Sequence, residues 1–197
     1  MSKHANITAV ILAGGRGRRM GGEDKGLIEL NGEPLIKHVI AAIAPQVGPI
    51  LINANRNQAR YEAFGYPVVA DSLLNYQGPL AGFITALEAI ATEDMVTLPC
   101  DGPLVPGDMV ERLYQARQSA NADIAVAHDG KRLQPVHALI PKRLSESLQG
   151  YLDGGDRKID LWYERHRVVH ADFSDIPRTF INVNTLQERD SLEGSAA

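Results

Sequence analysis

Glycine and basic residues are concentrated in one short segment near the beginning of this chain. Between Gly14 and Gly26, six of the thirteen residues are glycine and four are arginine or lysine. Glycine lets the backbone approach an anion closely and direct successive N–H groups toward it, while basic side chains supply positive charge. The β-branched, apolar run at residues 7–12, which leads into this segment, is typical of a buried strand. A strand that ends in such a loop predicts a phosphate-binding site.

The spacing within the loop does not match two common nucleotide-binding motifs. A P-loop requires Gly-Lys followed by Ser or Thr, whereas Lys25 stands between Asp24 and Gly26. The dinucleotide-binding fingerprint requires glycine at its first, third and sixth positions. Counting from Gly15, the sixth position holds Met20. The predicted phosphate loop therefore belongs to neither class.

Polar residues follow other predicted strands along the chain. Asn53, Asp71 and Asp101 each end or follow an apolar run. Because ligands bind beyond the carboxyl ends of parallel strands, we expect these side chains to meet the glycine-rich loop at one edge of a sheet. A carboxylate that faces bound phosphate can serve as a ligand of Mg²⁺, which is one interpretation of Asp101. The alternative for Asp101 is a turn or helix-capping residue before Pro103.

Apolar runs alternate with segments of helical periodicity, which predicts an α/β protein. The expected strands are residues 7–12, 49–53, 67–70, 95–99, 123–127, 135–140 and 167–171. Two of the expected helices begin at Pro34 and at Pro79. Three more are expected at residues 107–119, 142–152 and 185–193. We expect a three-layer α/β/α sandwich with a mostly parallel central sheet. Residues 1–193 are expected to form a single domain, and residues 194–197 a disordered tail.

The composition argues against several functional classes. The chain has 197 residues and a formal net charge of −4, so we expect no broad basic surface for nucleic acid. No run of about 18 apolar residues predicts a membrane span, and no secretory signal is expected. The single cysteine, Cys100, is expected to be a small buried residue rather than a nucleophile, and it fits a reducing cytoplasm. The six histidines lack metal-ligand spacing.

The glycine-rich loop resembles the signature loop of nucleotidyltransferases with a Rossmann-like fold. Its Leu-Ala-Gly-Gly, Arg-Arg-Met-Gly-Gly and Asp-Lys-Gly sequences carry this likeness. Five further segments, in the same order, make nearly the whole chain similar to the molybdenum cofactor guanylyltransferases. These segments are residues 51–56, 71–72, 78–82, 99–101 and 180–185. The resemblance implies Mg²⁺-dependent transfer of GMP from GTP to the terminal phosphate of molybdopterin, which releases diphosphate and forms molybdopterin guanine dinucleotide.

The resemblance also implies roles for individual residues. Arg19 and Lys25 are expected to bind phosphate and neutralise charge on the leaving diphosphate, and Asp101 is expected to hold the metal. These three residues are the expected catalytic residues. The expected nucleotide-binding residues are Leu12, Ala13, Gly14, Gly15, Lys25, Asn53, Asp71, Gly78, Pro79, Gly82 and Asp101. The expected molybdopterin-binding residues are Arg157, Lys158, Asn182 and Asn184, so the N-terminal half would bind GTP and the C-terminal half molybdopterin.

Some expected contacts are more specific. The backbone N–H groups of Ala13 and the two following glycines are expected to cradle phosphate. Guanine needs acceptors for its N1–H and N2 donors, and the candidates are the Leu12 carbonyl and the Asn53 and Asp71 side chains. Gly82 is expected to allow close approach of the nucleotide. The family often has Thr, Ala or Met after the metal-binding Asp, and Gly102 in that place is expected to loosen the loop.

Other functions remain open from the sequence. One is a related nucleotidyltransferase that uses CTP, or one that acts on a sugar or alditol phosphate. Another is a catalytically silent protein that carries the cofactor. We expect a cytoplasmic monomer that binds neither nucleic acid nor membranes. The resemblance further implies transient contacts with molybdenum-insertion proteins and molybdoenzyme chaperones.

Overall fold

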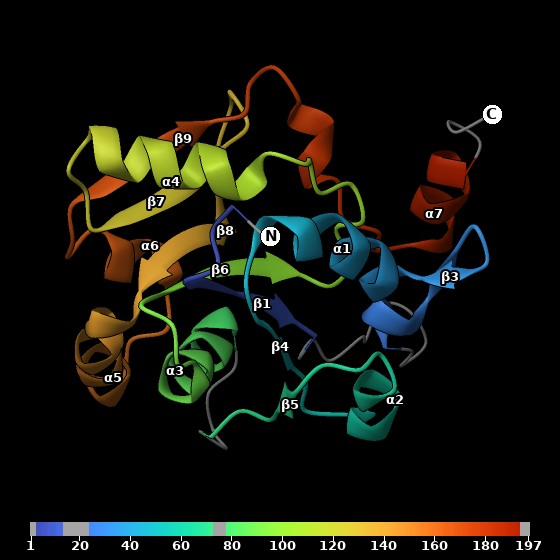
Figure 1. Ribbon diagram of the computed structural model, residues 1–197, viewed down its shortest axis with the longest axis horizontal. Coiled ribbons are helices and arrows are strands. Elements are labelled where there is room, and N and C mark those ends of the chain that lie inside the picture. Colours follow the sequence, from blue (N-terminus) through green and yellow to red (C-terminus); the bar gives the residue numbers. More distant parts are fainter. Residues whose placement is uncertain (1–2, 14–23, 73–77, 194–197) are drawn as a thin grey trace.

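The computed structural model describes residues 3–13, 24–72 and 78–193 (Figure 1). A seven-stranded sheet lies at its centre. The strands are β1 (Ile7–Leu12), β4 (Ile50–Asn53), β5 (Val68–Val69), β6 (Asp94–Pro99), β7 (Ile124–His128), β8 (Leu133–Pro141) and β9 (Val168–Asp172). Their order across the sheet is β5-β4-β1-β6-β8-β7-β9. The first four strands in this order are parallel, β8 is antiparallel to both of its neighbours, and β9 is parallel to β7.

Helices cover both faces of the sheet (Figure 1). They are α1 (Leu35–Ile43), α2 (Gln58–Glu62), α3 (Pro79–Ala89), α4 (Met109–Ser119), α5 (Ser145–Asp153), α6 (Ile159–Tyr163) and α7 (Leu186–Glu193). Successive side chains of a strand point to opposite faces. In β1, Ala9 and Ile11 therefore pack with α1 and α4, while Val10 packs with α3 and α5. The expected three-layer α/β/α sandwich is confirmed.

A small hairpin links the glycine-rich loop to α1. It consists of β2 (Glu29–Leu30) and β3 (Glu33–Pro34), which are antiparallel. Asn31 and Gly32 form its turn with φ of 52° and 78°, as a two-residue hairpin turn of this kind requires. A separate small core connects the hairpin region to the C-terminal part of the chain. Its buried members are Ile28, Leu30, Leu35 and Val183.

All seven predicted strands are confirmed within two residues at either end. The predicted helices are also confirmed, with two differences. Helix α1 begins at Leu35, because Pro34 ends β3, and residues 142–144 form a separate 3₁₀ turn before α5. The sequence did not indicate α2 and α6, because helices of only five residues are too short to show a helical period. Residues 194–197 lie outside the described part. Within that part, no helix has the length and apolarity needed to cross a membrane.

Candidate active site

Lys25 and Asp101 form an ion pair at the carboxyl edge of the sheet. Lys25 begins a 3₁₀ turn just before β2, and Asp101 lies two residues beyond β6. The Lys25 Nζ atom is 3.0 Å from Asp101 Oδ2, and the two side chains are 26% and 12% exposed. Partial burial strengthens the attraction between the charges. The expected convergence of the glycine-rich loop and Asp101 is confirmed for these two residues.

Asn184 is the second partner of Lys25. The Lys25 ammonium group donates a hydrogen bond to Asn184 Oδ1 at 2.5 Å. The backbone just before Asn184 is held against the loop that contains Asp101, because the Val183 N–H group donates to the Asp101 carbonyl at 2.8 Å. Glu188, in the first turn of α7, accepts from Asn184 N–H at 2.7 Å. Asn184 was predicted for the molybdopterin side, and the structure places it beside the expected catalytic pair.

Asn182 carries a buried amide oxygen in the same segment. Among the described residues, its Oδ1 is the buried side-chain polar atom that lacks a hydrogen-bond partner. A side chain at Gly102 would bring its Cβ to 3.2 Å from this oxygen, and Gly102 itself is buried. The glycine that departs from the family pattern therefore leaves space beside Asn182. An oxygen of this kind is suited to receive a donor or a cation from a ligand.

Asn53 and Asp71 meet at the ends of β4 and β5. Asn53 Nδ2 donates to Asp71 Oδ1 at 2.9 Å, and Asn53 is 3% exposed. Asn55 completes the arrangement, because its Nδ2 donates to Asp71 Oδ2 at 2.7 Å and its Oδ1 accepts from Asp71 N–H at 2.8 Å. The sequence reasoning did not single out Asn55. A second asparagine, two residues beyond the strand, was the available signal.

One expectation for this part of the site is wrong. The Ala13 N–H donates to the Asn53 carbonyl at 2.8 Å, so it continues the sheet ladder and does not face phosphate. A Cβ on Gly82 would lie 2.5 Å from Asn53 Oδ1 and 2.8 Å from Leu12 Cδ2. The missing side chain of Gly82 thus makes room for two protein side chains. The Leu12 carbonyl accepts from Cys100 N–H at 3.1 Å and keeps its second lone pair.

The start of α3 is as predicted. Gly78 has φ of 138° and Pro79 is the first helical residue, positions that favour glycine and proline respectively. Three other predicted residues, Gly14, Gly15 and Arg19, lie outside the described residues.

Cys100 is buried, and burial, followed by the neighbouring Asp101 carboxylate, raises the pKa of its thiol well above the usual value. A thiol with a raised pKa stays protonated and is a poor nucleophile. This agrees with the interpretation of Cys100 as a small buried residue.

Arg157 and Lys158 lie in the segment between α5 and α6. The Arg157 guanidinium donates to the Leu152 and Asp156 carbonyls at 2.9 and 2.6 Å, and both Arg157 and Lys158 are exposed. Figure 1 shows α5 and α6 at the opposite end of the view from α7, which follows Asn184. The four predicted molybdopterin-binding residues are therefore divided between two places.

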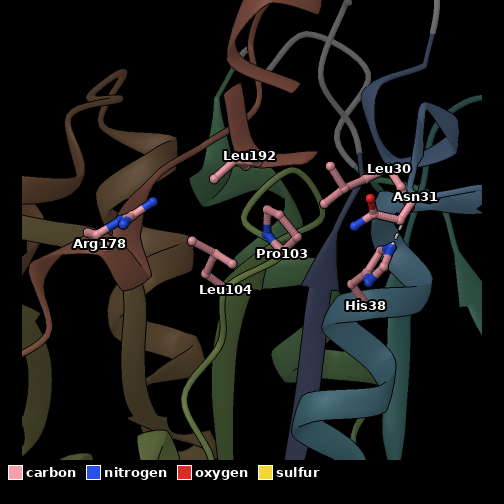
Figure 2. Close-up of a pocket in the computed structure, with 7 residues that line it drawn as sticks. All are labelled: Leu30, Asn31, His38, Pro103, Leu104, Arg178 and Leu192. Carbon is pink, nitrogen blue, oxygen red and sulfur yellow. Dashed lines mark hydrogen bonds between the residues drawn. The ribbon is translucent and has the colours of Figure 1, made fainter. Parts of the chain in front are cut away.

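A pocket of about 360 Å³ adjoins the candidate site (Figure 2). Pro103 and Leu104, which follow the Asp101 loop, form part of its wall, and Figure 2 shows Arg178 and His38 on opposite sides. His38 Nε2 is hydrogen bonded to the Leu30 carbonyl at 2.9 Å. Among the residues that the structure describes, none of those implied by the resemblance as site residues lines this pocket.

Comparisons with known proteins show the family of this chain. A family model described as "MobA-like NTP transferase domain" matches residues 9–169. Two curated relatives named molybdenum cofactor guanylyltransferase, from Shewanella sediminis and Shewanella loihica, are each 53% identical over 97% of this chain and 97% of their own length. The chain belongs to the molybdenum cofactor guanylyltransferase family. This confirms the family that the sequence motifs indicate.

Solved structures support the fold assignment of this family member. Molybdopterin-guanine dinucleotide biosynthesis protein A from Archaeoglobus fulgidus superposes with a TM-score of 0.78 at 26% identity, over 96% of this chain and 98% of that one. A 4-diphosphocytidyl-2C-methyl-D-erythritol synthase from Anaerococcus prevotii has a TM-score of 0.73 at 13% identity, over 96% and 95% of the two chains. The second likeness shows only the shared nucleotidyltransferase fold, because the sequences have diverged too far to imply a common substrate.

Proposed function

We propose that this member of the family transfers GMP from GTP to the terminal phosphate of molybdopterin. The products are diphosphate and molybdopterin guanine dinucleotide. The observation that carries the proposal is the contact of Lys25 with both Asp101 and Asn184. This cluster lies at the same sheet edge as the Asn53–Asp71 pair, so one bound nucleotide can reach both.

The reaction needs no general base from the protein. A phosphate monoester already carries an ionised oxygen at pH 7. That oxygen attacks the α-phosphorus of GTP, and the bond from this phosphorus to the bridging oxygen breaks as diphosphate leaves with its electron pair. Lys25 supplies positive charge where negative charge develops. The remaining contribution of the site is to hold two anionic substrates in line.

We infer that Mg²⁺ is the cofactor. Asp101 and the buried Oδ1 of Asn182 are hard oxygen donors, and Mg²⁺ is usually held by one or two carboxylates together with substrate phosphates. The lack of a hydrogen-bond partner for Asn182 Oδ1 among the described residues supports this fit. Within the described part, no group of three His, Cys, Asp or Glu residues is placed to hold a metal. Mg²⁺ would therefore bind with the nucleotide and neutralise phosphate charge.

For the acceptor, the proposal assigns two separate groups of residues. Asn182 and Asn184, beside Lys25 and Asp101, would contact the terminal phosphate where it meets GTP. Arg157 and Lys158, together with Arg19 on the nucleotide side, are proposed to supply cationic contacts. The exposure of Arg157 and Lys158 supports their access to a ligand.

The cellular setting is also part of the proposal. We infer a cytoplasmic protein, which the buried, reduced Cys100 supports. We infer a monomer, because the large hydrophobic residues exposed in the described part are limited to Leu104 and Leu161 and form no broad apolar face. Product transfer would involve transient contacts with molybdenum-insertion proteins and molybdoenzyme chaperones. Light scattering of the purified protein tests the monomer.

Calorimetric titration with GTP, CTP and ATP, each with Mg²⁺, tests the function. We expect binding of GTP alone, and diphosphate release when molybdopterin is added. Preference for CTP would indicate a cytidylyltransferase instead. Binding of GTP without diphosphate release in the presence of molybdopterin would support the carrier function. Removal of Mg²⁺ with EDTA should stop diphosphate release.

A further inference from the structure

Asp24, the residue before Lys25, is buried, and each of its carboxylate oxygens accepts a hydrogen bond. Its residue exposure is 6%. Tyr61, in α2, donates its hydroxyl hydrogen to Asp24 Oδ1 at 2.5 Å, and Asn57 Nδ2 donates to Oδ2 at 3.1 Å. Burial, with further contributions from Cys100 and from Asp24 itself, raises the pKa of Tyr61 far above its usual value. The raised pKa keeps the Tyr61 phenol in its protonated form, which donates the hydrogen bond to Asp24.

Gly26, the residue after Lys25, is equally constrained. A Cβ at this position would lie 2.7 Å from the Tyr61 hydroxyl oxygen and 3.1 Å from both Cβ and Sγ of Cys100. No side chain fits there without moving these groups. The Tyr61 hydroxyl therefore contacts both neighbours of Lys25, binding one by a hydrogen bond and packing against the other.

Lys25 itself has a long, flexible side chain whose position depends on where its backbone is held. The two hydrogen-bond partners of its ammonium group, Asp101 and Asn184, come from distant parts of the chain. The ammonium can satisfy both only while the 3₁₀ turn stays in place. Asn57 and Tyr61, at the start of α2 and within it, hold the Asp24 end of that turn.

We propose that Tyr61 and Asp24 are positioning residues that hold the Lys25 ammonium at the reacting phosphates. The inference rests on the proposed guanylyltransferase function. Tyr61 and Asp24 touch neither substrate, and they act by fixing the backbone on either side of Lys25. Neither was singled out as functional by its spacing in the sequence, because Tyr61 lies in a short helix 37 positions from Asp24.

The test is Tyr61→Phe, which removes the hydroxyl and keeps the ring. Tyr163→Phe is the matched control, since Tyr163 is also buried and its hydroxyl donates to the Pro135 carbonyl at 2.7 Å, away from Lys25. We expect Tyr61→Phe to lower kcat about tenfold, the rate equivalent of a lost hydrogen bond to a charged group. Tyr163→Phe should leave kcat unchanged, with a similar loss of thermal stability in both variants.

The same substitution in a Lys25→Ala protein separates a positioning role of Tyr61 from a general loss of stability. If Tyr61 acts through Lys25, then Tyr61→Phe should change kcat less than about twofold in a Lys25→Ala protein, because residues that act as a unit are not additive. An equal, tenfold loss in both backgrounds would overturn the proposal, as would wild-type kcat in Tyr61→Phe. Asp24→Asn should behave in the same way, because one of the two donors would then face an amide N–H₂ group.

Failure of this proposal is distinguishable from failure of the proposed function. Each assay includes the wild-type protein with GTP, Mg²⁺ and molybdopterin. Absence of diphosphate release by wild-type protein contradicts the guanylyltransferase function. Normal release by wild-type protein and by Tyr61→Phe contradicts only the positioning role.

Discussion

Asn53 Nδ2 lies 2.9 Å from Asp71 Oδ1, so the ends of β4 and β5 share a hydrogen bond at the edge of the sheet. The carboxylate also accepts from Asn55, and Asn53 is almost fully buried. Asp71 is thus held in one orientation before any ligand binds. An oriented acceptor is what discrimination between bases requires, because a mismatched donor leaves a polar group unpaired.

Asp71→Asn tests this nucleotide contact. The variant keeps the shape of the side chain but loses the charge and places an N–H₂ group opposite either Asn53 or Asn55. We expect GTP affinity to fall about tenfold, which corresponds to one lost hydrogen bond to a charged acceptor, while kcat at saturating GTP changes little. Calorimetry and steady-state kinetics check the two parts. A fall in kcat with unchanged GTP affinity would show that Asp71 acts in the chemical step rather than in nucleotide binding.

Asp101→Ala should reduce turnover by at least about a hundredfold, because it removes the proposed metal ligand and frees Lys25 from its ion pair. The fold should survive, since the Asp101 backbone bond to Val183 is unaffected. Circular dichroism and diphosphate release measure the two effects. Asp190→Ala, at an exposed position in α7, is the control. Full activity of Asp101→Ala in Mg²⁺ would remove this residue from the metal site.

Gly82→Ala should destabilise the protein by about 1–3 kcal/mol, because the new methyl group collides with Asn53 and Leu12. Gly150→Ala is the matched helical control, since Gly150 in α5 is exposed and nothing lies within 4 Å of its added Cβ. That variant should gain about 0.5–1 kcal/mol. Urea unfolding measures both. Equal stability of the two variants would show that the packing around Gly82 is not as tight as described.

Because His137 is buried, we expect the protein to lose stability in mild acid. Its ring is buried against Phe180, and burial lowers the pKa of His137 to about 4 from 6.5. As the pH falls below 6.5, His137 becomes protonated in the unfolded chain, whereas in the folded protein it stays neutral down to about pH 4. The free energy of unfolding therefore decreases as the pH falls from 6.5 toward 4. We expect the free energy of unfolding to decrease by about 2 kcal/mol between pH 7 and pH 5 from this group.

Urea unfolding of wild-type protein and of His137→Gln at pH 7 and pH 5 measures this effect. The variant lacks the titrating group, so its stability should depend less on pH. The same pH dependence in both proteins would show that other groups are responsible.

Arg157→Ala should raise the KM for molybdopterin more than it changes the affinity for GTP, because Arg157 lies between α5 and α6, two helices that Figure 1 shows at the opposite end of the view from α7. Calorimetry with GTP and diphosphate release at varied molybdopterin separate the two. Arg132→Ala, another exposed arginine, is the control. A defect confined to GTP binding would contradict the assignment of Arg157 to the acceptor.

Strand positions and the residues that follow them were predictable from sequence, because a buried strand needs an apolar run and a ligand needs polar groups where the run ends. Asn53, Asp71 and Asp101 illustrate this. Pairings across long separations were not predictable. The contact between Lys25 and Asn184 joins residues 159 positions apart, and no local pattern encodes it. The role of Ala13 was mistaken for a related reason, since the sequence does not reveal which partner its N–H takes.

The contact of Lys25 with Asn184 also has a consequence for synthesis of the protein. Translation proceeds from the N-terminus, so Lys25 leaves the ribosome long before its partner is made. The sheet order places β1, β4, β5 and β6 together, and these strands are complete by residue 99. A nascent chain can therefore form the nucleotide side of the site early, while the cluster around Lys25 is completed only when Asn184 has emerged. Premature termination before that residue would leave a partly folded chain with an unfinished catalytic centre.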